Sequence, residues 1–152
     1  MEDAPFYARD MAVNDALKEL EKSFVSNAYR YFSVKDVDIW NEEDYSLIDK
    51  RVNPRGLDVN VRPYVRNLRG YPLCRSFDRT TKTYSLRFKS EPGVPRRVIY
   101  IPETIQYSDG FQVSVSDGNF EHHNDSVLIL YYPSSDGHHV ITVEPTQKMV
   151  MN

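Results

Sequence analysis

The chain has 152 residues, of which 40 % are hydrophobic, 27 % charged and 12 % aromatic, and its formal net charge is −3. This balance is typical of a folded globular protein with a sizeable core, and it excludes a chain that is disordered throughout. No apolar run approaches the ~20 residues of a membrane span, and residues 1–5 carry neither the basic nor the apolar part of a secretory signal, so the compartment is left open.

The charge is distributed unevenly along the chain. Residues 1–61 carry eight Lys/Arg and thirteen Asp/Glu, residues 62–97 carry ten and two, and residues 98–152 carry one and seven. The net charges of the three segments are therefore −5, +8 and −6. A basic segment of this kind can form a face for phosphate or anionic lipid. In the simpler interpretation, which we favour, basic and acidic strands lie side by side and neutralise each other.

The first predicted element is an amphipathic helix. An apolar stripe recurs at helical spacing, at Val13, Ala16, Leu17, Leu20 and Phe24. Asp10 or Asn14 is the expected cap at its start, and Asn27 suits its end because asparagine tolerates the left-handed conformation.

A short strand is expected at residues 29–34, and an acidic segment around Trp40 follows it. Residues 50–60 have the turn chemistry of a connector. One helix and one strand are too little for a closed core, so residues 1–61 look like a piece of an α/β domain.

After Arg62 the pattern becomes that of an all-β domain. Six strands are predicted, at residues 73–77, 84–88, 97–101, 111–115, 127–132 and 140–143. Residues 127–132 are apolar on both faces, which indicates a central strand, and we expect a hairpin between them and residues 140–143. Three Ser-Asp-Gly triplets, which end at Gly110, Gly118 and Gly137, are interpreted as hairpin turns. The expected fold is an antiparallel β-sandwich over residues 62–146, with a tail at 147–152.

Several residues are candidates for chemistry. The four histidines form two adjacent pairs, and neighbours on a strand point to opposite faces, so we expect solvated loop histidines and no metal site. Cys74, the only cysteine, excludes an internal disulfide and is expected to pack as a small hydrophobe. The carboxylates beside Trp40 suit either a glycosidase site with a sugar platform or a solvated loop. Catalysis by the adjacent pair Glu42 and Glu43 is disfavoured, because retention requires two carboxyl groups ~5 Å apart across a sugar.

The segment of residues 62–97 also interleaves arginines with aromatic residues, a pattern found in nucleic-acid-binding proteins. The overall pI of about 5.8 and the alternation of the aromatic residues as core positions argue against a nucleic-acid partner. No motif for a cofactor is present, and none is expected.

Several motifs in the second half of the chain resemble the start of a known domain. They are Arg62-Pro63-Tyr64, Gly70-Tyr71-Pro72-Leu73, Ser76-Phe77-Asp78 and Thr81-Lys82-Thr83-Tyr84. Together they resemble the C-terminal β-sandwich of endoglycoceramidase-like members of glycoside hydrolase family five, a group that includes glucosylceramidases and steryl-β-glucosidases. Upstream, residues 40–48 look like the family's Trp-Asn-Gly-Glu-Asp-Leu-Ser-Ile segment, which follows the eighth strand of its catalytic (β/α)8 barrel. Residues 16–21 are similar to the seventh barrel helix, and residues 29–34 would be the eighth strand.

The resemblance covers about residues 10–146 and implies a function. It makes residues 1–61 the end of a catalytic barrel, and the whole chain the C-terminal part of a retaining β-glycosidase of glucosylated lipids. The implied partners are the barrel of the same enzyme, a glycolipid substrate and a membrane surface. The family's two catalytic glutamates lie upstream of the matched region, so the resemblance places no catalytic residue in this chain.

The candidate site residues follow from this resemblance and from the charge pattern. Trp40, Asn41, Glu42 and Asp44 are expected at the substrate rim, and Arg62, Arg66 and Arg69 are candidates for contact with lipid headgroups. The family's usual tryptophan at the eighth strand is replaced here by Phe32-Ser33-Val34. The alternative hypothesis is a stand-alone, non-catalytic β-sandwich that binds carbohydrate, through Tyr131 or Tyr132, or a protein partner.

Overall fold

The structure is a computed structural model of the chain, and it describes residues 6–27, 47–48, 51–91, 93, 96–123 and 128–146. The chain divides into two compact units, Met1–Asn60 and Val61–Asn152. The predicted strand at residues 29–34 and the acidic segment around Trp40 lie outside the described residues.

The first unit contains helix α1 (Phe6–Lys22) and the short helix α2 (Leu57–Asn60). Between them Ile48 pairs with Pro54 in an isolated antiparallel bridge. Within the described part of the chain, no helix is long and apolar enough to cross a membrane.

The predicted helix is confirmed, but both of its predicted ends are wrong. The helix begins at Phe6, ahead of the expected caps Asp10 and Asn14. At the other end, the left-handed residue is Phe24, with φ of 53°, and not Asn27. The Val25 amide donates to the Leu20 carbonyl, so the chain closes the helix by backbone bonds of the Schellman type before it reaches Asn27.

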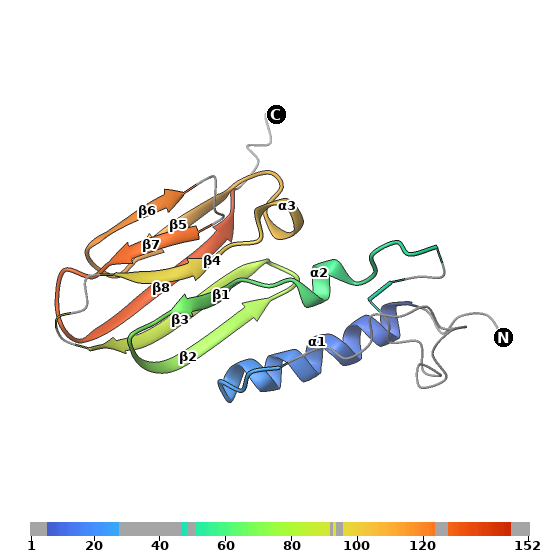
Figure 1. Ribbon diagram of the computed structural model, residues 1–152, viewed down its shortest axis with the longest axis horizontal. Helices are drawn as coiled ribbons and strands as arrows, with labels where there is room; N and C mark the ends of the chain where they lie inside the picture. Colours follow the sequence, from blue (N-terminus) through green and yellow to red (C-terminus); the bar gives the residue numbers. More distant parts are fainter. Residues whose placement is uncertain are drawn as a thin grey trace. The chain divides into compact units, whose positions relative to one another are not determined.

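The second unit is a sandwich of two antiparallel sheets, as predicted (Figure 1). In the part of the chain that the structure describes, its strands are β1 (Tyr64–Asn67), β2 (Gly70–Asp78), β3 (Thr83–Ser90), β4 (Arg97–Tyr100), β5 (Phe111–Val115), β6 (Asn119–His123), β7 (Leu128–Tyr132) and β8 (His138–Pro145). One sheet has the order β1-β4-β7-β6 and the other the order β2-β3-β8-β5. The short helix α3 (Glu103–Gln106) follows β4.

The core lies between the two sheets. Alternate residues of β3 face it, and Tyr84, Leu86 and Phe88 are fully buried there. From the opposite sheet Tyr131 meets Phe88 edge to face, with the ring centroids 6.1 Å apart. Such aromatic pairs add to the free energy gained by burying apolar area. The alternation of apolar and polar residues that predicts β3 therefore matches the alternation of buried and more exposed residues along this strand.

The pairing of the strands corrects three expectations. Strands β7 and β8 belong to different sheets, so the predicted hairpin between them is wrong. The structure has two further strands, β1 and β6, at the edges of one sheet. The Ser-Asp-Gly triplets do adopt positive φ at Gly110, Gly118 and Gly137, yet none closes a hairpin. The first follows α3, and the other two connect one sheet to the other.

Cys74 also differs from its expected position. It lies exposed on β2, next to an irregularity in the pairing with β3 between Pro72 and Cys74. Strand β2 is at the edge of its sheet, and most of its residues are exposed, so this cysteine is not a packed core residue.

Candidate functional site

The predicted site residues fall into two groups. The rim candidates Trp40, Asn41, Glu42 and Asp44 lie outside the described residues, so their roles stay predictions. Of the headgroup candidates, Arg66 and Arg69 are exposed, whereas Arg62 is only 7 % exposed. The Arg62 guanidinium lies 5.6 Å from the centroid of the Phe77 ring, so most of this side chain is buried against the sandwich, and its contact with a headgroup stays a prediction.

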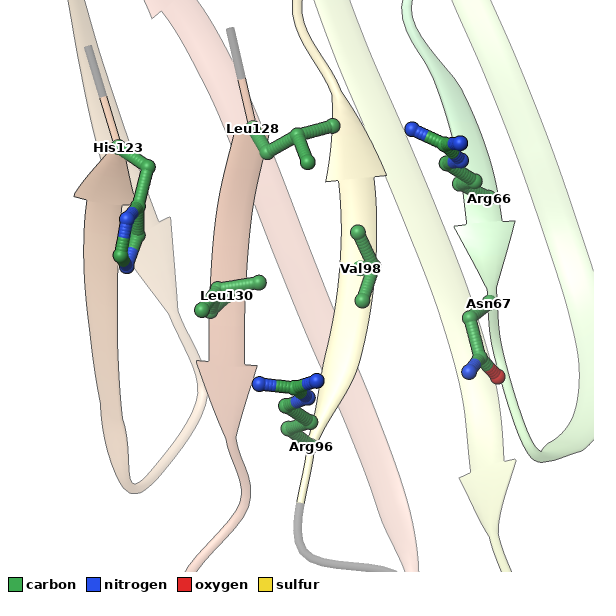
Figure 2. A pocket seen from close by; sticks show the side chains of 7 residues that line it. All are labelled: Arg66, Asn67, Arg96, Val98, His123, Leu128 and Leu130. Atoms are coloured by element: carbon green, nitrogen blue, oxygen red, sulfur yellow. The ribbon is translucent and has the colours of Figure 1, made fainter. Parts of the chain in front are cut away.

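An open hollow lies on the outer face of the sheet β1-β4-β7-β6 and has a volume of about 520 Å³. Its lining residues are Arg66, Asn67, Arg96, Val98, His123, Leu128 and Leu130. Figure 2 shows Val98 beside Leu130 with Leu128 above them, Arg66 to the right at about the height of Leu128, and Arg96 below. The hollow therefore has an apolar floor between two guanidinium groups.

The floor is a direct result of the sequence of β7. On this strand Ile129 and Tyr131 are fully buried toward the core, so the alternate residues Leu128 and Leu130 point to the outer face. In the neighbouring strand β4, Val98 pairs with Leu130 and also points outward. The apolar residues on both faces of β7 predict that it is a central strand, and β7 is indeed paired on both sides, with β4 and with β6. Its second apolar face lines the hollow.

The charge of the hollow comes from arginine. Arg66 and Arg96 have no hydrogen-bond or ion-pair partner among the described residues. At the β6 edge His123 Nε2 lies 3.6 Å from Glu121 Oε2, so the nearby carboxylate already has a histidine beside it. Arg66 and Arg96 therefore line the same hollow, and Arg96 belongs to the basic segment of residues 62–97 that the sequence offers for headgroup contact, although it is not one of the three arginines singled out there. Its position just before β4 in the strongly basic segment is the signal that could have indicated it.

A second polar cluster joins the two connections between the sheets. Asp117, in the link between β5 and β6, accepts hydrogen bonds from Tyr131 Oη at 2.7 Å and from His139 Nδ1 at 2.7 Å. Its other oxygen accepts from the backbone and hydroxyl of Ser134 and from the hydroxyl of Ser135. A carboxylate only accepts hydrogen bonds, so His139 must carry a proton on Nδ1.

The hydrogen bonds determine the ionisation of this cluster. Burial alone would raise the pKa of the Asp117 carboxyl, but the hydrogen bonds from Tyr131, His139, Ser134 and Ser135 outweigh it, and the pKa lies well below its usual range. Burial and the hydrogen bond to Asp117 raise the pKa of the Tyr131 hydroxyl well above its usual value. Asp117 therefore stays a charged acceptor at neutral pH, and Tyr131 stays a donor.

The expectation that the histidines are solvated loop residues is wrong for His139. This residue is fully buried on β8, and its ring lies 5.2 Å from the ring of Phe88. His122 lies on β6 with Nε2 2.7 Å from Glu103 Oε1. Among the residues that the structure describes, no three potential ligands come together in a way that could hold a metal ion.

Two other residues differ from their expected surroundings. Arg97, from the basic segment, is fully buried, donates to Ser90 Oγ at 3.1 Å and lies over the Phe88 ring. Burial lowers its pKa from the usual value. Tyr131, one of the two tyrosines considered as a sugar contact, is fully buried in the core. The cluster around Asp117 is thus structural in geometry, and the outer hollow is the candidate site.

Comparison with known proteins gives the family. Residues 62–144 match the model of the glycoside hydrolase family 5 C-terminal domain. No curated protein sequence matches the chain.

Solved structures give the same fold. Sterylglucosidase 1 of Cryptococcus neoformans is similar with a TM-score of 0.75 and 16 % identity, over 95 % of this chain and 25 % of that chain. Endo-glycoceramidase II of Rhodococcus sp. is similar with a TM-score of 0.70 and 19 % identity, over 92 % of this chain and 30 % of that chain. In its complex with ganglioside GM3, the same enzyme aligns over 91 % of this chain with 17 % identity and a TM-score of 0.70.

The chain spans less than a third of the length of these structures. At these identities the likeness concerns the fold, whereas the family follows from the match to its own domain model over more than half of the chain. The chain belongs to the family of proteins that carry the glycoside hydrolase family 5 C-terminal domain.

Proposed function

We propose that this chain is the C-terminal part of a retaining β-glycosidase that hydrolyses the bond between sugar and lipid in glucosylated lipids. In this proposal residues 62–146 are its C-terminal sandwich, and residues 1–61 are the last helix and strand of its catalytic barrel. The two catalytic glutamates lie outside this chain, on the barrel that is its partner.

One observation carries the proposal. The family model matches residues 62–144, yet the likeness to the two solved enzymes covers 92–95 % of the chain. The likeness therefore includes most of the first unit, which precedes the sandwich. A stand-alone sandwich has no need of such a segment, whereas the end of a catalytic domain joined to its C-terminal domain accounts for it.

The names of the two similar enzymes support the substrate class. One is a sterylglucosidase and the other an endo-glycoceramidase solved with ganglioside GM3, so both act on a sugar joined to a lipid. Retaining glycosidases use two carboxyl groups about 5 Å apart, one as nucleophile and one as acid and base. In the proposal the barrel supplies this pair, and the sandwich stabilises the end of the barrel to which it is joined.

The test uses the protein from its source cells. An antibody against residues 62–146 captures the native polypeptide, whose mass is measured before it is assayed on glucosylceramide and on a steryl glucoside. We expect a polypeptide of roughly three to four times the 17.8 kDa of this chain, because the chain covers 25–30 % of its similar structures. It should hydrolyse at least one of the two lipids, and the first sugar released should be the β-anomer, as retention requires.

The recombinant 152-residue chain is the matched control and should hydrolyse neither lipid. Turnover by this short chain would place the catalytic groups within it and would contradict the proposal. So would a captured species of 17.8 kDa that neither carries a second polypeptide nor acts on either lipid.

A further inference from the structure

We propose that the outer face of the sheet β1-β4-β7-β6 docks on the anionic surface of a lipid bilayer, with Arg66 and Arg96 as its charged contacts. This outer face is defined by the seven residues that line the hollow, together with Tyr100, which pairs with Leu128, and Tyr64, which pairs with Tyr100. The proposal concerns a binding surface and needs no catalytic step.

The first argument is the composition of this outer face. Antiparallel sheets usually place apolar residues on the face toward the core and polar residues on the solvated face. Here the two central strands place Val98, Leu128 and Leu130 on the outer face as well. The hollow above them is open, which suits a broad surface better than an enclosed small ligand.

The second argument is charge. Arg66 and Arg96 flank the apolar floor, and neither has a polar partner among the described residues. No described carboxylate lines the hollow. Arginine binds phosphate and carboxylate groups through its planar fork of donors, and both groups are present in anionic lipid headgroups. A suitable partner for this face therefore combines anionic groups, which would contact the two arginines, with apolar groups, which would contact the floor. The headgroups and acyl chains of an anionic bilayer provide this combination.

The third argument is Tyr64. Its side chain is 45 % exposed on β1, and its ring lies 5.0 Å from that of Tyr100 on the paired strand β4. Tyrosine is enriched where protein meets the headgroup region, because its ring is apolar and its hydroxyl is polar. Tyr64 pairs with Tyr100, which in turn pairs with Leu128 of the hollow, so Tyr64 lies on the same face as the apolar floor.

The experiment measures how the intact chain sediments with vesicles. One set is pure phosphatidylcholine, and the other contains about 30 % phosphatidylserine, whose negative surface attracts basic residues. We expect binding only to the anionic vesicles, and we expect it to weaken as salt rises from about 0.05 to 0.5 M, because the Debye length falls to a few ångströms. The double variant Arg66→Gln/Arg96→Gln should bind about 25-fold more weakly, since each basic residue near such a surface contributes ~1 kcal/mol, or about fivefold.

The matched control is Arg87→Gln/Lys89→Gln. These two residues are exposed on β3, where Tyr84, Leu86 and Phe88 face the core, so their charges lie on the outer face of the other sheet. The control removes the same charge and should bind as the wild type does. Equal loss in both double variants would mean that only the net charge matters, and would overturn the proposal.

Two further outcomes decide the proposal. Equal binding to neutral and anionic vesicles, or no binding to either, would overturn it and would leave an acidic protein as the partner to consider. Tyr64→Ser is a second variant that keeps both arginines, and it should weaken binding several-fold while leaving the salt dependence unchanged. Thermal unfolding of each variant checks that the fold is retained. The vesicles contain no glycolipid, so this result is independent of the glycosidase assay.

Discussion

Asp117 links two connections of the sandwich through a single carboxylate. It lies between β5 and β6, and its hydrogen bonds come from residues 131–139, which span the end of β7, the next link and the start of β8. Hydrogen bonds to a charged group contribute more than those between neutral groups. We therefore expect Asp117→Asn to lower the free energy of unfolding by about 3 kcal/mol in urea denaturation, because the side chain loses its charge and its amide donor has to face the Ser134 backbone N–H, which can only donate.

Asp136→Asn is the matched control for this prediction. Asp136 is the central residue of another Ser-Asp-Gly triplet and lies exposed in the link between β7 and β8. An exposed carboxylate of this kind should change the stability by less than about 0.5 kcal/mol. If both substitutions cost the same small amount, the cluster around Asp117 does not stabilise the fold as the geometry indicates.

The same cluster predicts a dependence of stability on pH. The pKa of Asp117 is held below its ordinary value in the folded chain, so its contribution is fully present above the unfolded pKa of about 4 and is lost as pH falls through the folded pKa. The difference in unfolding free energy between wild type and Asp117→Asn should therefore be constant between about pH 5 and 7 and should shrink below about pH 4. Denaturation at a series of pH values measures it, and a difference that grows toward acid would contradict the assignment.

The residues of this cluster illustrate what the sequence could and could not predict. His139 precedes the inward residues Ile141 and Val143 at spacings of two, so the alternation of β8 extended by one step would have placed it in the core. The expected hairpin between β7 and β8 instead places His139 in a turn, outside the alternating part of the strand. Arg97 similarly precedes Ile99 by two residues, yet a basic segment suggests a surface. Its partners, Ser90 Oγ and the Phe88 ring, come from another strand and are visible only in the folded structure.

At the scale of elements, the links between the sheets depend on glycine. Gly118 has φ of +73°, and a Cβ atom at this position would collide with the Tyr132 carbonyl oxygen and lie 3.0 Å from the Pro133 Cα. The obstacles are backbone atoms of the β7–β8 link, which cannot rotate away. Gly118→Ala should therefore lower the free energy of unfolding by at least about 4 kcal/mol in denaturant titration.

Gly93 provides the comparison, because it has nearly the same φ of +75° but no described atom lies within 4 Å of the position that a Cβ atom would take. Gly93→Ala should cost only the strain of the left-handed conformation, about 1–2 kcal/mol. The additional loss of unfolding free energy at Gly118, compared with Gly93, measures how closely the β5–β6 link approaches the β7–β8 link. Equal losses at the two positions would mean that the backbone conformation alone explains the requirement for glycine.

The pairing of elements could be predicted only in part. Strands β3, β5 and β8 alternate clearly, and the structure confirms them. The Ser-Asp-Gly triplets correctly predict a positive φ at Gly118 and Gly137. They do not predict whether the chain returns to the same sheet or crosses to the other one. Strand β6 is not predicted from the sequence, because all five of its residues are exposed at a sheet edge and therefore show no alternation of apolar and polar residues.

For the whole molecule, the sequence predicts the class of the second unit and its family through the motifs that begin at Arg62. The match to residues 62–144 agrees with that resemblance. The end of a barrel in residues 1–61 stays a prediction, because its strand and its Trp-Asn segment lie outside the described residues. In that prediction the segment would complete its core with strands outside this chain, so its own residues carry too little pattern to determine the fold.

This division leads to a prediction about the second unit alone. The buried core cluster lies entirely between Phe77 and Val143, and α3 is held by Gln106 Nε2, which donates to the Val61 carbonyl at 2.7 Å. Every one of these contacts is retained in a chain of residues 61–146. We therefore expect this shortened chain to fold, with the same slowly exchanging amides in β3, β7 and β8 as the full chain, because exchange of core strands reports global unfolding.

The measurement is amide hydrogen exchange on the shortened and the full chain, with Phe88→Ala introduced in both. Phe88 is fully buried, and its removal should cost about 3–5 kcal/mol in each background. Equal losses mean that residues 1–60 add nothing to the core of the sandwich, whose stability is then a property of the second unit. Loss of protection in the shortened chain would contradict this, because it would mean that the sandwich needs the first unit in order to fold.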